Sequence, residues 1–126
     1  MKAVVLFAHG SRDPLWRAPI EAVAQAVRQQ SPDTAVACAY LELCPPDLPQ
    51  ACQALMDQGA TTVRVLPVFF GMGKHAREDL PELMAALRQQ HPGTHFELLP
   101  AAGEHPALTR LLAHMALGSL PPENPA

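Results

Sequence analysis

Charged residues, aromatic residues and cysteines are all scarce in this chain, and each scarcity excludes a class of protein. Lys, Arg, Asp and Glu make up 17% of the 126 residues, the net charge is −3, and no basic cluster occurs, which argues against nucleic acid or an anionic membrane as the main partner. No apolar run reaches the roughly 20 residues that a bilayer-spanning helix needs. The first residues carry no signal-peptide pattern. The composition is that of a soluble globular protein.

The three cysteines, Cys38, Cys44 and Cys52, are odd in number and have no CxxC spacing. This usage argues against a disulfide framework and predicts a cytoplasmic chain with reduced thiols. Cys38 falls in a predicted strand and Cys52 on an apolar helix face, so both are expected in the core. Only Cys44, two residues after Glu42, is a candidate neighbour of a site.

Apolar segments alternate with amphipathic segments along the chain, which predicts one α/β domain over residues 1–117. Apolar strands separated by helices form a parallel sheet with helices on both faces, and right-handed crossovers favour the flavodoxin-like strand order 2-1-3-4. Residues 118–126 are rich in proline and are expected to form a disordered tail. The predicted strands are 2–8, 35–41, 62–69 and 94–99, and the predicted helices are 14–30, a helix capped by Asp47, a helix beginning near Asp79 or Leu80 with Pro81 in its first turn, and 106–117.

Three side chains with metal-binding or acid–base chemistry follow three different predicted strands. His9 follows the first strand, Glu42 follows the second, and His75 lies in the loop after the third. In open parallel sheets ligands bind beyond the carboxyl ends of the strands, where the strand order reverses. Two imidazoles and a carboxylate suit divalent cobalt, nickel, iron or zinc, and they can accept protons near neutral pH. The sequence therefore predicts a metal or acid–base site at this edge.

Each of these residues also has a plain structural interpretation. A single His at a strand end is more often a hydrogen-bonded loop residue than a ligand, and Glu42 could be a solvated loop charge. Gly10 and Ser11 could do no more than shape the turn before the first helix. His105 lies at the same edge, one strand away, and has no assigned role. The convergence of three loops is what favours a site over separate surface residues.

The segment 66–79 is the stretch around which the predicted site is organised. A buried strand leads into Gly71 and Gly73, which give a loop that can adopt backbone angles closed to other residues. Lys74, His75 and Arg77 follow directly and precede an amphipathic helix. A loop of this kind at the end of a strand is a favourable place for chemistry on an α/β scaffold.

Two motifs together resemble the CbiX/SirB group of class II tetrapyrrole chelatases. They are HGSR at residues 9–12, after the first strand, and PVFFGMGKH at 67–75 with Asp79 beyond it. Glu42, in the segment 40–43, falls where that family carries its active-site glutamate. The resemblance covers about residues 1–117.

That family inserts a divalent metal ion into sirohydrochlorin, giving a cobalt product for cobalamin, sirohaem from iron, or a nickel product in some archaea. The resemblance implies cobalt first and iron next as a metal substrate, and no organic cofactor. Larger members carry two similar halves, whereas this chain has the length of one half, so a homodimer is implied. It assigns His9, His75 and Glu42 to catalysis and to holding the metal, and it assigns the following residues to substrate binding: Ser11, Arg12, Gly73, Lys74 and Arg77.

Two other functions fit part of the pattern. A non-catalytic protein that binds or delivers a metal or a tetrapyrrole would need the same ligands. A phosphohistidine-type phosphatase or mutase also has His-Gly after a strand, but it needs an arginine directly before the histidine, where this chain has Ala8. The first alternative stays open on the sequence alone, and the second is disfavoured.

Overall fold

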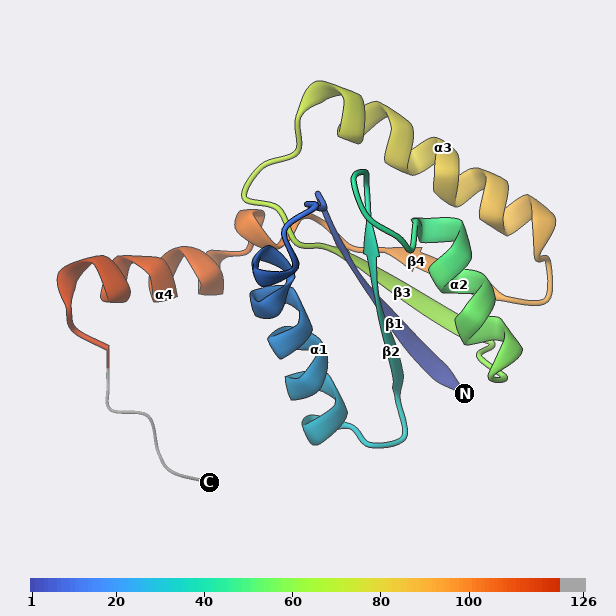
Figure 1. Ribbon diagram of the computed structural model, residues 1–126, viewed down its shortest axis with the longest axis horizontal. Helices are drawn as coiled ribbons and strands as arrows, with labels where there is room; N and C mark the ends of the chain where they lie inside the picture. Colours follow the sequence, from blue (N-terminus) through green and yellow to red (C-terminus); the bar gives the residue numbers. More distant parts are fainter. Residues whose placement is uncertain (121–126) are drawn as a thin grey trace.

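The computed structural model describes residues 1–120 and contains one four-stranded parallel sheet (Figure 1). The strand order is β2-β1-β3-β4, which confirms the predicted flavodoxin-like order. In chain order the elements are β1 (Lys2–Ala8), the 3-10 turn η1 (Pro14–Arg17), α1 (Ala18–Gln30), β2 (Ala35–Tyr40), α2 (Leu48–Asp57), β3 (Thr62–Pro67), α3 (Lys74–Gln90), β4 (His95–Leu98), the 3-10 turn η2 (Ala102–Glu104) and α4 (Pro106–Leu117).

The main core lies between the sheet and the helices α2 and α3. Alternate residues of each strand point to one face of a sheet, so Val5, Val63 and Val65, each 0% exposed, share one face. Leu55 from α2 and Met84 from α3 pack in the same buried cluster. These side chains are large and apolar, and their removal from water is the main favourable term in forming this layer.

Within residues 1–120, the opposite face of the sheet is covered only in part. Helix α1 lies over β1 and β2, where Ala24 and Leu6 are buried. Over β3 and β4 this face carries the exposed ion pair between Arg64 and Glu97, 3.0 Å from Nε to Oε2, and the half-buried Leu66. Helix α4, the fourth helix, points away from the sheet (Figure 1) and has no buried residue.

Two predicted helix caps are confirmed. The Asp13 carboxylate accepts a hydrogen bond from the Leu15 amide at 2.9 Å, although the helix predicted over 14–30 begins with the separate turn η1. At α2, Asp47 and Gln50 form a reciprocal capping box, with both bonds at 2.9 Å. Such caps satisfy amides that have no partner inside the helix, and they fix the loops after β1 and β2.

The prediction for the third helix was wrong. Helix α3 begins at Lys74, so Pro81 lies inside it rather than in its first turn. Proline removes one helical hydrogen bond and crowds the preceding turn, but Pro81 is exposed and its ring displaces no core side chain. Leu80 and Met84 beside it are buried, and their packing holds the helix together across this position. As a consequence, His75 belongs to the first turn of a helix and not to a loop.

Smaller differences concern element ends. Strand β3 ends at Pro67 instead of residue 69, and β4 spans 95–98 instead of 94–99. Gly118 ends α4 in a left-handed conformation with φ 68°. The predicted tail 118–126 lies outside the described residues from 121 onward. Among residues 1–120, no helix combines the length and the apolar character needed to cross a bilayer.

Candidate functional site

The loops that follow β1, β2 and β3 meet at the carboxyl edge of the sheet (Figure 1). His9 directly follows β1, Glu42 lies two residues after the end of β2, and His75 is the second residue of α3. All three side chains are exposed. The predicted site residues therefore lie on one edge, and they come from the strands on either side of the point where the strand order reverses.

Strand pairing continues past the ends of β1 and β2 and fixes the position of Glu42 relative to His9. The Glu42 amide donates to the His9 carbonyl at 3.0 Å, and the Leu41 amide donates to the Ala8 carbonyl at 2.9 Å. Residues held by such a backbone ladder have little freedom to move apart. The two candidate residues are thus adjacent because the β1–β2 ladder extends by two residues.

Gly10 makes this close approach feasible. Its φ is +101°, a region that residues with a Cβ rarely adopt, and a Cβ placed there would overlap the Glu42 carbonyl oxygen. Gly71 and Gly73 do not use this conformational freedom: Gly73 has an ordinary extended conformation with φ −62°, and Gly71 is not in the left-handed region either. Apart from the adjoining residues, no atom of the described chain lies within 4 Å of a Cβ built at Gly71 or Gly73. Those two glycines leave open space next to the backbone.

The side chain of His9 packs against an aromatic ring of the core. Its imidazole packs edge-on against Phe69, with 4.6 Å between ring centroids. Phe69 is 6% exposed and belongs to the core, whereas the next residue, Phe70, is 74% exposed. Two neighbouring phenylalanines therefore have different surroundings, one in the core and one exposed at the site.

The three candidate ligands do not form a coordination sphere. Among residues 1–120, no group of three or more His, Cys, Asp and Glu side chains is close enough to hold a metal ion. His9 and Glu42 are linked through their backbones, while His75 stands on α3. An open arrangement of this kind suits a metal that must be released again better than a metal that is kept permanently.

Cationic side chains surround this edge. Arg12, Lys74 and Arg77 are all exposed, and within the part of the chain that the structure describes the one ion pair joins Arg64 and Glu97, elsewhere on the sheet. Ser11 acts locally, since its hydroxyl oxygen accepts a hydrogen bond from the Asp13 amide at 3.0 Å. The three cations are available to a bound anion, and Ser11 shapes the loop that carries Arg12.

Exposed apolar side chains also lie at the same edge of the sheet. Each of the first three loops carries some, and Leu43 also has a left-handed backbone with φ 71°, which is uncommon for a residue with a branched side chain. The sequence did not indicate this exposure for Leu15, Trp16 and Leu41, because the first two fall in the helix predicted over 14–30 and the third ends the strand predicted over 35–41. Together they could contact a flat apolar ligand: Leu15 and Trp16 after β1, Leu41 and Leu43 after β2, and Phe70 after β3.

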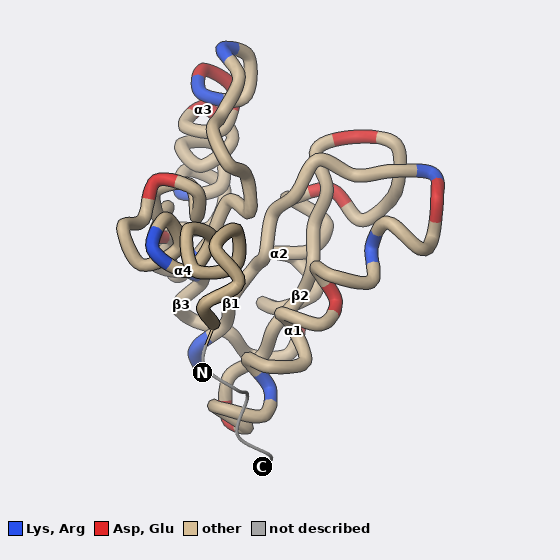
Figure 2. The backbone as a smooth tube through the Cα atoms, turned by 90° about the vertical axis from the view of Figure 1, so that its left-hand side faces the viewer, with Lys and Arg blue, Asp and Glu red and all other residues tan. Residues whose placement is uncertain are grey.

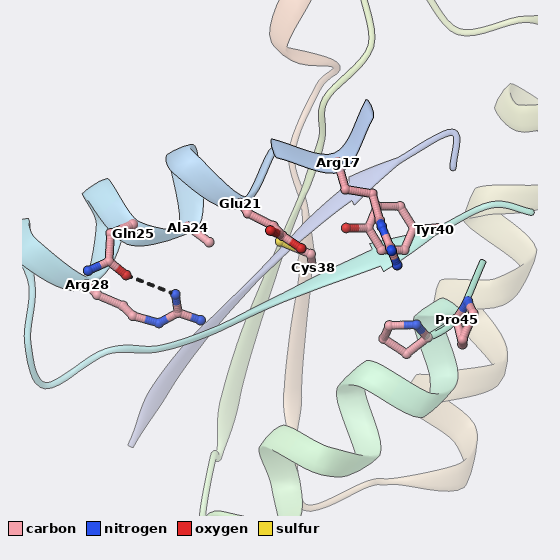
Figure 3. Close-up of a pocket in the computed structure, with 9 residues that line it drawn as sticks. Arg17, Glu21, Ala24, Gln25, Arg28, Cys38, Tyr40 and Pro45 are labelled. Carbon is pink, nitrogen blue, oxygen red and sulfur yellow. Dashed lines mark hydrogen bonds between the residues drawn. The ribbon is translucent and has the colours of Figure 1, made fainter. Parts of the chain in front are cut away.

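The three cysteines and His105 are not part of the group formed by His9, Glu42 and His75. Cys52 is 0% exposed in the core, and burial raises the pKa of its thiol to about 11, which keeps it neutral. Cys38 lines a cavity of about 460 Å³ between α1 and β2 with Glu21 and Tyr40 (Figure 3), and burial, then the Glu21 charge, raises its pKa. His105 caps α4, its Nδ1 accepting from the Ala107 amide at 3.0 Å. Cys44 is half-buried and free.

A protein-family model described as CbiX matches residues 3–117. The chain belongs to the CbiX family. Among curated proteins it is 34% identical, over 84 residues, to the sirohydrochlorin cobaltochelatase of Methanopyrus kandleri, which covers 67% of this chain and 59% of that protein. The match to the sirohydrochlorin cobaltochelatase of Methanocaldococcus jannaschii is 33% identical and covers 72% of this chain and 64% of that protein. The match to each thus spans less than two thirds of the relative's length.

A solved structure gives the same result for this CbiX-family chain. A putative cobalamin biosynthesis CbiX protein from Marinobacter aquaeolei superimposes with a TM-score of 0.79 at 28% identity, covering 94% of this chain and 96% of that one. The family and the fold inferred from the two motifs are thereby confirmed. The match includes both motif segments, because it extends over residues 3–117.

Proposed function

We propose that this CbiX-family protein is a sirohydrochlorin chelatase, which inserts a divalent metal ion into a carboxylate-rich tetrapyrrole. Cobalt is the first candidate metal and iron the second. In the reaction the ring loses two pyrrole N–H protons and gains the dication, so the protein must hold a metal loosely and accept protons. The single observation that carries the proposal is the placement of His9, Glu42 and His75 on one carboxyl edge in a chain that matches CbiX over residues 3–117.

The proposed roles follow from the chemistry of these side chains. Neutral imidazoles at His9 and His75 are borderline ligands that suit cobalt and iron in the divalent state, and they also accept protons near neutral pH. Glu42 is held beside His9 by the hydrogen bond between their backbones. Its carboxylate is suited to take up a proton or to complete the metal's coordination. The metal is a substrate here, and the chain needs no organic cofactor for this reaction.

The surroundings of these residues suit the proposed macrocycle. Sirohydrochlorin carries many carboxylates, for which Arg12, Lys74 and Arg77 supply positive charge. Exposed apolar side chains, among them Phe70 at 74% exposure, supply contacts for the flat ring. The open space at Gly73 allows a bulky ligand to approach the backbone. We further infer a homodimer, since the chain corresponds to one half of the larger chelatases, and a cytoplasmic location, since Cys38, Cys44 and Cys52 are free.

The experiment that tests the proposal mixes the purified protein with sirohydrochlorin and cobalt(II) and follows the change in absorbance as the metal enters the ring. The expected result is a rate proportional to protein concentration and well above the spontaneous rate. A parallel reaction with iron(II) under anaerobic conditions compares the two metals. Tight binding of metal or tetrapyrrole without acceleration would instead identify a delivery protein and would refute the enzymatic assignment.

A further inference from the structure

A cavity of about 460 Å³ lies between α1 and the outer edge of β2. Pockets that bind small molecules typically measure about 300–1,000 Å³, so this cavity has the size of a binding site. Figure 3 shows Arg17 and Glu21 on the helix side of the cavity and Cys38 and Tyr40 of β2 on the other side. None of the residues assigned above to metal insertion or to sirohydrochlorin lines it. The cavity is therefore separate from the proposed chelatase site.

Arg17 and Glu21 bring opposite charges to this cavity and do not neutralise each other. Positive and negative residues alternate along η1 and α1 (Figure 2). Arg17 and Glu21 are four positions apart, the spacing at which helical side chains commonly form ion pairs. Within residues 1–120, however, the one ion pair joins Arg64 and Glu97. The half-buried guanidinium of Arg17 and the carboxylate of Glu21 are thus both available to a ligand in the cavity.

The Tyr40 hydroxyl is a hydrogen-bond donor at the same cavity. Tyr40 is 3% exposed, and the Trp16 ring lies against it with 6.3 Å between ring centroids. Burial, and then the charges of Cys38 and Glu21, raise the pKa of Tyr40 to about 12, so the hydroxyl keeps its proton at neutral pH. In the described part of the chain its polar neighbour is the Cys38 thiol, whose sulfur is a weak acceptor. Because buried polar groups normally have a good hydrogen-bond partner, this hydroxyl is suited to an acceptor on a ligand.

The backbone of Cys38 adds a donor and an acceptor at the outer edge of β2. The neighbouring positions of this edge are occupied, since the Tyr40 amide donates to the Pro46 carbonyl at 2.9 Å and Arg28 Nη2 donates to the Val36 carbonyl at 3.4 Å. In a parallel strand, alternate residues direct their N–H and C=O groups to the same side. Cys38 lies between Val36 and Tyr40, so its N–H and C=O groups also point outward, and β2 has a neighbouring strand only on its other side.

A cation, an anion and neutral hydrogen-bonding groups therefore share one cavity. Glu21 would repel a simple anion, and Arg17 would repel a metal cation. We propose that the cavity binds a small zwitterion of the α-amino acid class, with its carboxylate on Arg17 and its ammonium group on Glu21. The Tyr40 hydroxyl donates a further hydrogen bond to the carboxylate, and the Cys38 carbonyl accepts one from the ammonium group. This assignment does not depend on the proposed chelatase function.

Thermal unfolding in the presence of each proteinogenic α-amino acid, at millimolar concentration, tests the ligand class. At least one amino acid is expected to raise the melting temperature by about 2 °C or more, because a ligand that binds only the folded state stabilises it. The N-acetyl and the amide derivatives of that amino acid each lack one of its two charges. Each is expected to bind about 10-fold more weakly in calorimetric titrations. Absence of any stabilisation, or equal binding of either derivative, would overturn the proposal.

Substitutions in the cavity test its location. Arg17→Gln and Glu21→Gln each remove one charge and keep a polar side chain, and each is expected to weaken calorimetric binding of that amino acid by about 10-fold or more. Arg110→Gln is the matched control, since it removes an exposed arginine from α4, outside the cavity, and should bind as the wild type does. Wild-type affinity in both cavity variants would refute the site. Metal insertion is not measured here, so failure of the chelatase assay and failure of this site remain separate results.

Discussion

The imidazole of His9 and the ring of Phe69 meet edge to face, with 4.6 Å between centroids and 72° between planes. His9 is exposed, whereas Phe69 is 6% exposed and lies in the core. Phe69 is also in edge-on contact with the buried Phe7, at 5.9 Å between ring centroids, so its own position is fixed by packing in the core. A rigid aromatic support of this kind limits the orientations open to the candidate ligand above it, and sites work best when such supporting residues are locked by packing.

We expect Phe69→Leu to lower the rate of metal insertion by about 10-fold or more, because His9 loses the surface that orients it. The same change removes buried aromatic area and should lower the free energy of unfolding by about 1–2 kcal/mol. The control is Phe96→Leu, a buried aromatic on β4 that is 2% exposed and away from the site. It should lose similar stability in a denaturant titration and keep its rate per folded molecule. Equal rates in the two variants would contradict a positioning role for Phe69.

His9→Ala and His75→Ala should each reduce insertion by about 100-fold or more, the size expected when a group that moves protons is lost. Both side chains are exposed, so circular dichroism should remain native-like. His95→Ala is the matched control, because His95 is also exposed but begins β4 at the opposite edge of the sheet. Full activity of both site variants would refute the assignment of these histidines.

The sheet could be predicted from the sequence because each strand is a short apolar run and each loop carries its own turn signal. The helix caps at Asp13 and Asp47 could also be predicted, because each capping hydrogen bond joins residues that lie within a few positions of each other in the sequence. Pro81 misled the prediction because a local rule against proline inside helices was overridden by tertiary packing of Leu80 and Met84. Sequence patterns report local preferences, and burial by distant segments is not among them.

The site could be predicted only as a set of residues on one edge. The sequence did not show that Gly10 is the position where a glycine is required, because the constraint there is the Glu42 carbonyl, 32 positions away along the chain. The direction of α4 could not be predicted either. The apolar residues of this helix predict that one of its faces is buried, but they do not show which surface covers that face. Contacts between distant segments decide both features, and one sequence does not encode them in a visible pattern.

The stability of the fold should decrease between about pH 9 and pH 11. Burial raises the pKa of Cys52 from its ordinary value of 9.0 to about 11, so the folded state keeps the thiol neutral while the unfolded state already ionises. The stabilisation is complete below the unfolded pKa and is lost as the pH rises toward the folded pKa, a change of about 2 kcal/mol. Urea titrations at pH 8 and pH 10.5 measure it. Cys52→Ala should show a smaller decrease over that interval, and an equal decrease would assign the effect to other groups, such as Tyr40.

Gly10→Ala should destabilise the protein by about 2–4 kcal/mol, since the residue is held at φ +101° and its new Cβ would overlap the Glu42 carbonyl. Thermal unfolding measures the loss. Gly71→Ala is the control, because it meets no atom within 4 Å and lies outside the left-handed region, so its melting temperature should change little. A Gly10→Ala protein as stable as wild type would mean that the β1 and β2 loops can separate without cost.

Gly73→Val separates stability from ligand access. The backbone at Gly73 is extended, with φ −62° and ψ 162°, and no atom lies within 4 Å of a built Cβ, so valine fits the free protein. Gly73 is the N-cap of α3 and makes no side-chain hydrogen bond there; valine is a weaker N-cap residue than glycine, so the change costs about 1 kcal/mol of stability. If a flat macrocycle approaches the backbone here, the two added methyl groups will occupy its place. We therefore expect a folded protein with only a small loss of thermal stability, together with a KM for sirohydrochlorin raised by about 10-fold or more. Normal turnover by this variant would show that the ring approaches His75 from another side.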